Sequence, residues 1–282
     1  MGAASEGRIV SSGRVSHEPQ ATSGTHQPKS KKMKNFTIIA SSNVRIQKGK
    51  LDIKQEMSRL KINILGLCEV RWKGSGKVTL DGFTIIYSGG TKHEKGVAVL
   101  ISKSLKGFWA VSDRVMMIKL STKPLDLKII QVYAPTADST EEELETFYDD
   151  IEQALKQSKS TDITIIQGDF NAKLGEGRYE DIVGPFGLGE RNDRGQKLLE
   201  RAHSKDYMIG NTWFTQHPRR LATWRSPGDK YRNQLDFIMI KKRPCKTYPG
   251  ADCDSDHYPV ASKLCLRLKK NESIKKGRNN WL

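Results

Sequence analysis

The sequence predicts an α/β fold of two packed β-sheets with helices on their outer faces. Short runs rich in β-branched residues, separated by turn residues, recur along the chain and are too many for one small sheet. Three other segments carry apolar residues at helical spacing. With 36% hydrophobic residues in a chain of 282, a sizeable core is possible. Strands that alternate with helices, and elsewhere follow one another directly, favour two sheets covered by helices.

The predicted strands are short β-branched runs that are separated by turn residues. In chain order they span residues 36–43, 62–69, 82–88, 96–102, 114–120, 127–135, 163–169, 207–212, 222–227, 233–240 and 258–268.

The predicted helices span residues 50–61, 139–158 and 193–206. The second has the clearest apolar stripe, which consists of Leu144, Phe147, Tyr148, Ile151 and Leu155. Ser139 and Glu142 have the spacing of a capping box, which predicts that this helix begins at Ser139.

The ends of the chain differ in composition from its middle. Residues 1–34 are rich in Ser, Gly, Thr, His and Lys with almost no apolar clustering, which predicts a disordered basic tail. Residues 35–268 carry the strands and helices and are predicted to form one domain. Residues 269–282 are predicted to be a second basic tail.

The net charge of +16 suits a polyanionic partner such as nucleic acid. Residues 1–34 hold six Lys and Arg against two Glu, and residues 263–282 hold seven against one, which leaves +6 for the residues between them. The alternative is that the basic tails only aid solubility or nuclear import.

The cysteines and histidines indicate which cellular compartment and which metal sites to expect. The four cysteines form no C-x-x-C pair and the six histidines are scattered, so a zinc site is not expected. No run approaches the roughly eighteen apolar residues of a membrane helix, and the first residues lack the apolar stretch of a signal peptide. We expect free thiols, a nuclear or cytoplasmic location, no membrane partner and a monomer.

Several of the predicted strands finish in, or contain near their ends, polar residues able to bind metal or phosphate. They are Asn43, Glu69, Tyr133, Asp169, Asn171 and Asp236, together with the cluster Ser255-Asp256-His257 before the last strand. Aligned strands can bring such ends to one edge of a sandwich, where they would line a single cleft. Each of these residues, considered singly, could instead belong to a tight turn, a polar loop or a helix cap.

The order of these residues resembles that in the exonuclease–endonuclease–phosphatase superfamily, which includes DNase I and the apurinic endonucleases. The resemblance extends from about residue 36 to residue 268. More narrowly, "ILGLCEVRW", "IIQVYAPT", "GDFNAKLG", "FGLGERNDRG", "RNQLDFI" and "PGADCDSDH" resemble the endonuclease domain of RTE-type LINE retrotransposons and the related craniofacial development protein 2-like proteins. The resemblance implies a four-layer α/β sandwich, DNase I-like, with two mostly antiparallel sheets.

The resemblance also implies an enzyme, a Mg²⁺-dependent phosphodiesterase that nicks DNA in the manner of an apurinic endonuclease. Mg²⁺ prefers oxygen ligands and is usually held by one or two carboxylates, and Mn²⁺ is a possible substitute. The implied metal ligands are Glu69 and Asp256. The implied catalytic roles are as follows: Asp169 orients or deprotonates the attacking water, Asn171, Asn43 and Tyr133 bind the scissile phosphate, and His257, held by Asp236, stabilises the developing charge.

The sequence departs from the superfamily pattern at two places that bear on catalysis. Arg45 stands where apurinic endonucleases carry a second acid. The segment from Asp236 to Asp256 is several residues shorter than in the family. A shift of about 1 Å at a catalytic group can lower a rate roughly a hundredfold. If this connection is too tight, Asp256 and His257 would be misplaced and Asp236 could not hold His257, which would weaken catalysis more than binding.

A basic loop with interleaved aromatic residues is the predicted contact with the phosphate backbone of duplex DNA. Its members are Arg219, Arg220, Trp224, Arg225, Lys230, Tyr231 and Arg232. Basic side chains can hold phosphates while aromatic rings contact bases. The alternative is an ordinary exposed loop whose tryptophan packs inward. Residues 88–96 form a second candidate contact loop.

Two other functions remain possible from the sequence. The first is a catalytically impaired, DNA-binding relic of a retrotransposon. The second is an inositol-phosphate or sphingolipid phosphodiesterase, although the sequence has no amphipathic or apolar loop suited to a membrane surface.

Overall fold

The computed structural model describes residues 37–43, 52–80, 82–102, 105–123, 125–157, 162–240, 245–247, 257, 260–264 and 267–268. All of them fall within one compact unit, Lys34–Leu282. The two predicted basic tails, Arg45 and Asp256 lie outside the described residues.

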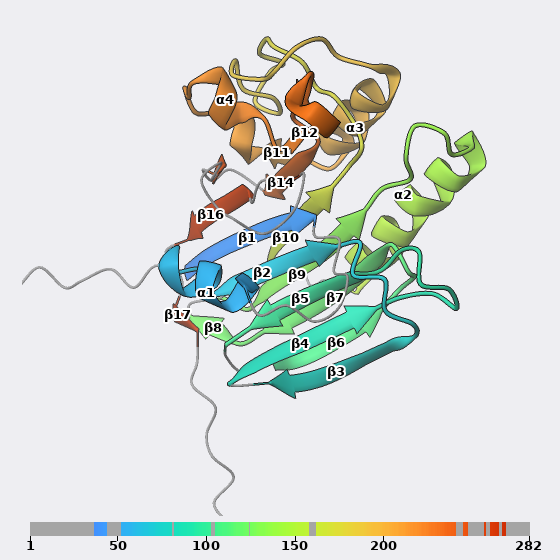
Figure 1. The fold of residues 1–282 in the computed structure, drawn as a ribbon, viewed down its shortest axis with the longest axis vertical. Coiled ribbons are helices and arrows are strands. Elements are labelled where there is room, and N and C mark those ends of the chain that lie inside the picture. The colour runs from blue at the N-terminus through green and yellow to red at the C-terminus, as the bar shows by residue number, and fades with distance from the viewer. Residues whose placement is uncertain are drawn as a thin grey trace, which may run out of the picture. The chain divides into compact units, whose positions relative to one another are not determined.

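Figure 1 shows the arrangement of the helices and strands. The helices are α1 (Asp52–Arg59), α2 (Glu141–Lys156), α3 (Asp193–Ser204) and α4 (Pro218–Leu221), with short 3₁₀ turns at Gly210–Thr212 and Pro227–Asp229. The strands are β1 (Thr37–Asn43), β2 (Ile64–Cys68), β3 (Ser75–Leu80), β4 (Phe83–Ser88), β5 (Val97–Ile101), β6 (Leu105–Ala110), β7 (Val115–Leu120), β8 (Thr122–Lys123), β9 (Leu127–Tyr133), β10 (Ile163–Asp169), β11 (Met208–Ile209), β12 (Trp224–Arg225), β13 (Arg232–Asn233), β14 (Asp236–Ile240), β15 (Cys245–Thr247), β16 (Val260–Leu264) and β17 (Arg267–Leu268).

Two large sheets form the centre of the fold. One has seven strands in the order β15-β16-β1-β2-β5-β4-β3, and the other has six in the order β11-β14-β10-β9-β7-β6. Each sheet contains one parallel pair, β1 with β2 and β9 with β10, while its other pairs are antiparallel. The predicted pair of mostly antiparallel sheets is confirmed.

The two sheets pack face to face over an apolar core. Ile39, Ile64, Ile129, Ile165 and Ile238, from five different strands, are fully buried in it. Side chains alternate between the two faces of a strand, so the residues between these isoleucines point outward. This alternation sets which residues can meet across the two sheets.

Helices cover the outer face of each sheet. The buried stripe of α2 (Leu144, Phe147, Tyr148 and Ile151) and Leu198 and Leu199 of α3 pack with outward residues of the six-stranded sheet such as Ile130 and Ile166. Met57 of α1 packs with outward residues of the seven-stranded sheet such as Leu65 and Leu67. The layers are therefore helix, sheet, sheet and helix, and the predicted four-layer α/β sandwich is confirmed.

The structure differs from the sequence prediction at several elements. Strands β3 and β6 were not predicted, because they are edge strands whose sequences, "SGKVTL" and "LKGFWA", show no clear apolar alternation. The capping box of α2 joins Thr140 and Glu143, so the prediction of Ser139 and Glu142 is wrong by one residue. Residues 207–212 contain only a two-residue strand followed by a 3₁₀ turn.

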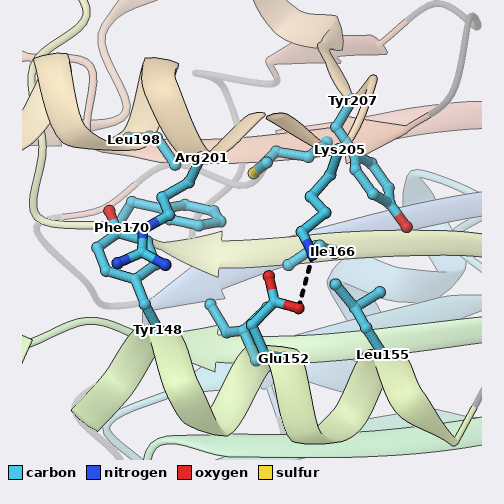
Figure 2. A pocket seen from close by; sticks show the side chains of 11 residues that line it. Tyr148, Glu152, Leu155, Ile166, Phe170, Leu198, Arg201, Lys205 and Tyr207 are labelled. Carbon is cyan, nitrogen blue, oxygen red and sulfur yellow. Dashed lines mark hydrogen bonds and ion pairs between the residues drawn. The ribbon is translucent and has the colours of Figure 1, made fainter. Parts of the chain in front are cut away.

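A cavity of about 30 Å³ lies between α2, α3 and the six-stranded sheet (Figure 2). Its lining is mostly apolar, and the ion pair between Lys205 Nζ and Glu152 Oε2, 2.9 Å apart, lies at its edge. A space of this size holds about one water molecule and is too small for a larger ligand. Among the described residues, no helix has both the length and the apolarity to cross a membrane.

Candidate active site

The two parallel strand pairs end at the same place in the sandwich and bring the polar strand ends together. In the seven-stranded sheet, Asn43 of β1 is the register partner of Cys68 of β2. Glu69, the residue after Cys68, therefore lies next to Asn43. In the six-stranded sheet, Asp169 is the register partner of both Tyr133 and Asp236. Hydrogen bonds then join the two groups across the sheets.

Asn43 is the bridge between the sheets. Its side-chain Nδ2 donates to Glu69 Oε1 and to Asp169 Oδ2, each at 3.0 Å. The amide therefore holds two carboxylates close together without adding charge. Since Asn43 is the last residue of β1 and is buried, its position is fixed by the sheet.

Glu69 is held in its ionised form. Partial burial raises the pKa of this carboxyl, but hydrogen bonds from Asn43, Arg71 and Tyr133 outweigh burial and lower the pKa below its usual value. The Tyr133 hydroxyl donates at 3.1 Å and an Arg71 guanidinium nitrogen at 3.0 Å. Glu69 has φ 55, a left-handed conformation that is uncommon for glutamate and that turns the chain sharply after β2.

Tyr133 closes the site on the side of β9. Burial, together with the charges of Glu69 and Asp169, raises the pKa of its phenol well above the usual value, so the hydroxyl remains protonated and can donate. The Arg114 guanidinium carbon lies 5.3 Å from the centre of the Tyr133 ring, and Arg114 also donates to the Tyr133 carbonyl at 3.2 Å. Arg114 therefore fixes the orientation of this tyrosine.

Asp169 lies at the centre of the site and is buried. Its Oδ1 accepts a hydrogen bond from the backbone N–H of Asn171 at 2.9 Å. The Asn171 side chain donates to the Ala134 carbonyl at 2.8 Å, so in this structure it holds two loops together. Gly168, with φ 149, lies so close to β9 that a Cβ would come within 1.9 Å of the Val132 carbonyl oxygen. Any side chain at this position would push the strands apart.

His257 is held by Asp236. The distance from His257 Nδ1 to Asp236 Oδ2 is 2.7 Å, and the distance from His257 Nε2 to Asp169 Oδ2 is 3.7 Å. The short connection predicted as a possible obstacle therefore does not prevent Asp236 from holding His257. Asp236 is in turn oriented by Thr223, whose hydroxyl accepts from the Asp236 backbone N–H at 3.0 Å.

Asp169 has an unusual protonation equilibrium. Burial and the neighbouring Asp236 carboxylate raise its pKa to about 7, although His257 and the hydrogen bonds from Asn171 and Asn43 act in the opposite direction. Asp169 therefore exchanges a proton near neutral pH. A carboxylate with this property can act as a general base at neutral pH.

The site offers two arrangements that could hold a metal ion. The ligand atoms of Asp169, Asp236 and His257 lie within 4.8 Å of one another. The 2.7 Å contact between Asp236 and His257 is, however, the length of a hydrogen bond, so these two atoms face each other. Glu69 fits a hard cation better, because its carboxylate is ionised and partly exposed. Asp256, the other predicted ligand, lies outside the described residues.

The basic loop lies beside His257. Trp224 of β12 makes an antiparallel backbone bridge to His257. Strands β12 and β13 form a hairpin with Tyr231 at 71% exposure, whereas Trp224 is half-buried. Tyr231 is thus the exposed aromatic residue of this loop.

The predicted basic residues of the loop do not all have the same surroundings. Arg219, Arg220, Arg225 and Lys230 are exposed. Arg232 makes a two-pronged ion pair with Asp229, and its Nε lies 2.6 Å from Asp229 Oδ1. Arg232 therefore supports the hairpin.

The second candidate loop, residues 88–96, lies beside the segment that follows β2. The Arg71 backbone N–H donates to the Lys95 carbonyl at 2.8 Å, and the His93 Nδ1 lies 2.7 Å from the Arg71 carbonyl oxygen. Lys92 and His93 are exposed there. Basic groups therefore flank the site on the Glu69 side as well as on the His257 side.

Three residues of the site were not predicted. Arg71 pairs with Glu69, Thr223 holds the backbone before Asp236, and Asn211 donates to the Asp236 carbonyl at 3.0 Å. All three lie within motifs quoted above or within predicted strands, but nothing in the sequence distinguished their side chains from their neighbours. Their roles depend on contacts between distant segments.

Comparisons with known proteins agree with this geometry. The model of the endonuclease/exonuclease/phosphatase family matches residues 40–257. Craniofacial development protein 2 of Bos taurus is 41% identical over 244 residues, which are 82% of this chain and 41% of the relative. Its counterpart in Tragulus javanicus is 37% identical over 265 residues, or 89% of this chain and 46% of the relative. The chain thus spans less than half the length of these curated relatives.

Solved structures share the fold. The endonuclease domain of TRAS1, a telomere-specific non-LTR retrotransposon, has a TM-score of 0.60 at 13% identity, covering 84% of this chain and 100% of that domain. An AP endonuclease from Archaeoglobus fulgidus has a TM-score of 0.54 at 15% identity, covering 80% of this chain and 98% of that one. The residues matched by the family model make up most of the chain and include Asn43, Glu69, Tyr133, Asp169, Asp236 and His257. The chain therefore belongs to the endonuclease/exonuclease/phosphatase family.

Proposed function

We propose that this chain is a divalent-metal-dependent endonuclease that nicks duplex DNA and that descends from a LINE retrotransposon. The observation that carries the activity is the chain of contacts from Asp236 through His257 to Asp169, with Asn43 joining Asp169 to Glu69. The motifs shared with RTE-type endonuclease domains support the descent.

The contacts of His257 define its part in the reaction. The Asp236 carboxylate can only accept a hydrogen bond, so Nδ1 of His257 carries a proton and Nε2 is directed to Asp169 and the substrate. A protonated Nε2 would donate to an oxygen of the scissile phosphate. It would thereby stabilise the negative charge that develops as water attacks phosphorus.

Asp169 is suited to handle the proton of the attacking water. Its pKa of about 7 means that an appreciable fraction is ionised at neutral pH. Water would lose a proton to Asp169 and bond to phosphorus as the bond from phosphorus to the 3′-oxygen breaks. The 3′-oxygen leaves as an alkoxide and takes a proton from solvent, which gives a 3′-hydroxyl and a 5′-phosphate. Tyr133 would turn its O–H from Glu69 to an oxygen of the same phosphate. Asn43, whose two N–H groups are donated to Glu69 and Asp169, would hold these carboxylates beside that phosphate.

A divalent cation fits at Glu69, where an ionised, partly exposed carboxylate offers hard oxygen ligands. When bound there, Mg²⁺ or Mn²⁺ would supply positive charge to the phosphate oxygens. Asp256 remains a proposed second ligand.

Duplex DNA is the proposed substrate because basic groups flank the site on two sides. Arg219, Arg220 and Arg225 lie on the His257 side, and Lys92 lies on the Glu69 side. Phosphate contacts of this kind position DNA without reading its sequence. Tyr231 is exposed and would stack on a base.

A plasmid nicking assay tests the proposal. Supercoiled plasmid should become open circular DNA with 3′-hydroxyl ends in Mg²⁺, and EDTA should prevent the conversion. Asp169→Asn and His257→Gln should each lower the rate at least about a hundredfold, within the usual range for a general acid or base. Asp181→Asn, at an exposed carboxylate paired with Arg178, is the matched control.

Each alternative function has its own outcome. Nicking that survives both site substitutions would refute the assigned site. Tight DNA binding without nicking by the native protein would identify a non-catalytic relic. Release of an inositol phosphate from a phosphodiester substrate, with DNA left intact, would indicate the small-molecule phosphodiesterase.

A further inference from the structure

Two buried glutamines lie directly beneath the site, in the space between the two sheets. Gln131 and Gln167 are register partners on β9 and β10, and both are fully buried. Each lies two residues before a residue of the site, Tyr133 and Asp169 respectively. Because residues two apart on a strand share a face, the glutamines point toward the same inter-sheet space as those site residues.

Every amide hydrogen of the two glutamines has an acceptor. Gln167 Nε2 donates to Gln131 Oε1 and to the Ala40 carbonyl, each at 3.0 Å. Gln131 Nε2 donates to Ser41 Oγ at 3.0 Å and to Cys68 Sγ at 3.2 Å. Ala40, Ser41 and Cys68 belong to the seven-stranded sheet, so the amides of the six-stranded sheet bond across the core.

A glycine in the seven-stranded sheet makes room for these amides. Gly66 of β2 is the register partner of Ser41. A Cβ at Gly66 would lie 1.7 Å from Gln131 Oε1 and 2.5 Å from Gln167 Nε2. The glutamines therefore pack directly against the backbone of the opposite sheet, a contact that any larger residue at Gly66 would prevent.

Farther from the site, the inter-sheet face on these strands is mostly apolar. Two residues farther from the site, the same faces of β1, β9 and β10 carry Ile39, Ile129 and Ile165. Apolar packing is not directional, whereas a hydrogen bond weakens steeply with distance and angle. The hydrogen bonds of Gln131 and Gln167 are therefore directional contacts, close to the site, that fix the position of one sheet relative to the other.

The site depends on this relative position of the two sheets. Asn43 follows Ser41 by two residues and donates to Glu69 of its own sheet and to Asp169 of the other, each at 3.0 Å. If one sheet slid by about 1 Å, Asn43 could not reach both carboxylates. Displacements of that size can lower catalytic rates by about a hundredfold.

We infer that Gln131 and Gln167 are positioning residues, which fix the two sheets relative to each other so that Asn43 can join Asp169 to Glu69. The kinetic consequence of this inference rests on the proposed nuclease function. Its structural consequence, the placement of the Asn43 side chain, does not.

Substitution by methionine tests the inference, because methionine resembles glutamine in size but cannot donate. In Gln131→Met and Gln167→Met, we expect the side-chain amide resonances of Asn43, followed by ¹H–¹⁵N NMR without metal, to shift or broaden. We expect kcat for nicking to fall at least tenfold, with KM for DNA unchanged within twofold. Ile165→Ala is the matched control, since it removes more apolar contact from the same face of β10. It should lower the melting temperature while leaving the Asn43 resonances unchanged and kcat within threefold of the native value.

The outcomes separate this inference from the proposed function. Unchanged Asn43 resonances in both glutamine variants would overturn the inference, and so would equal effects in Ile165→Ala. If the native protein does not nick DNA, the proposed function fails, and the Asn43 resonances still decide the inference. If the methionine variants do not fold, Ser41→Ala replaces them, because it removes one acceptor of Gln131 and should cause the same changes to a smaller extent.

Discussion

His257 and Asp236 are joined by a hydrogen bond of 2.7 Å between Nδ1 and Oδ2, and both side chains are buried. The backbone of the same histidine pairs with Trp224 at the base of the basic hairpin. The ring is therefore held both through its side chain and through its backbone. This double attachment ties the proposed catalytic group to the proposed DNA-binding loop.

Asp236→Asn should leave DNA binding intact and slow the chemistry. Asparagine keeps the size of the side chain but removes the charge that fixes the histidine tautomer and stabilises its protonated form. By analogy with other hydrolases in which a carboxylate holds a histidine, we expect kcat to fall by about 10²- to 10⁴-fold with KM nearly constant. Single-turnover nicking over a range of DNA concentrations measures both constants. A rise in KM at constant kcat would assign Asp236 to binding instead.

The rate of nicking should rise with pH through the neutral range. Because burial and Asp236 raise the pKa of Asp169 to about 7, lowering the pH below that value protonates the proposed base. The logarithm of the rate should then fall by about one for each pH unit. A bound divalent cation adds positive charge to the site and should move the midpoint below 7. The test is kcat from pH 5 to 9 at saturating Mg²⁺, and a flat profile would contradict the role of Asp169.

The same carboxyl should make the folded protein less stable as pH rises. Its folded pKa of about 7 lies above the unfolded value of about 3.9, so between these limits only the folded state binds the proton. This contribution to the free energy of unfolding is present at low pH and is lost as pH rises through 7. Asp169→Asn, which is neutral throughout, should therefore gain about 1–3 kcal/mol relative to the native protein between pH 5 and pH 8.

Urea unfolding in EDTA at both pH values measures this difference. Asp181→Asn is again the control, because its exposed carboxylate should change little between the two conditions. A stabilisation by Asp169→Asn that is equal at pH 5 and pH 8 would mean that Asp169 is already ionised in the folded protein at pH 5.

The sequence was sufficient to predict the fold and the positions of the polar strand ends. Buried central strands such as "ITIIQGD" have strong β-branched runs, and their alternation determines which side chains share a face. The edge strands β3 and β6 were missed because edge strands need no continuous apolar face.

Contacts between distant segments could not be predicted in the same way. Gln131 and Gln167 stand within apolar runs, and only the packing of the two sheets shows that their amides meet Ala40 and Ser41. Arg71 is similar, since the left-handed turn at Glu69 brings it back to that carboxylate. Such contacts depend on three-dimensional placement that one sequence does not specify.

Arg71→Gln should strengthen the binding of divalent cations. A guanidinium nitrogen of Arg71 lies 3.0 Å from Glu69 Oε2, so the arginine neutralises the carboxylate charge that would attract a metal cation. For a partly exposed pair, we expect removal of the arginine to be worth about 1 kcal/mol, or a fivefold lower half-saturating Mg²⁺ concentration. Calorimetric binding of Mn²⁺ provides a second measure that does not depend on activity.

Lys73→Gln is the control for Arg71→Gln, because Lys73 is an exposed cation two residues along the same segment. It should alter the Mg²⁺ requirement much less. If Arg71→Gln instead weakens Mn²⁺ binding, the guanidinium serves to hold the Glu69 carboxylate in place for the metal.

Tyr231→Ala should weaken DNA binding without affecting stability. The ring is 71% exposed, so the folded protein loses little packing when it is removed. Stacking of a base on an aromatic side chain is worth about 1–3 kcal/mol, which predicts at least about a fivefold loss of affinity.

Because Tyr231→Ala removes no phosphate contact, the salt dependence of DNA binding should not change in this variant. Arg219→Gln, in contrast, should lower the slope of log affinity against log salt concentration by about 0.9. Trp109→Ala, at another exposed aromatic residue on β6, should leave both the affinity and the slope unchanged. Equal losses in the Tyr231 and Trp109 variants, measured by fluorescence anisotropy at several salt concentrations, would place the DNA elsewhere on the protein.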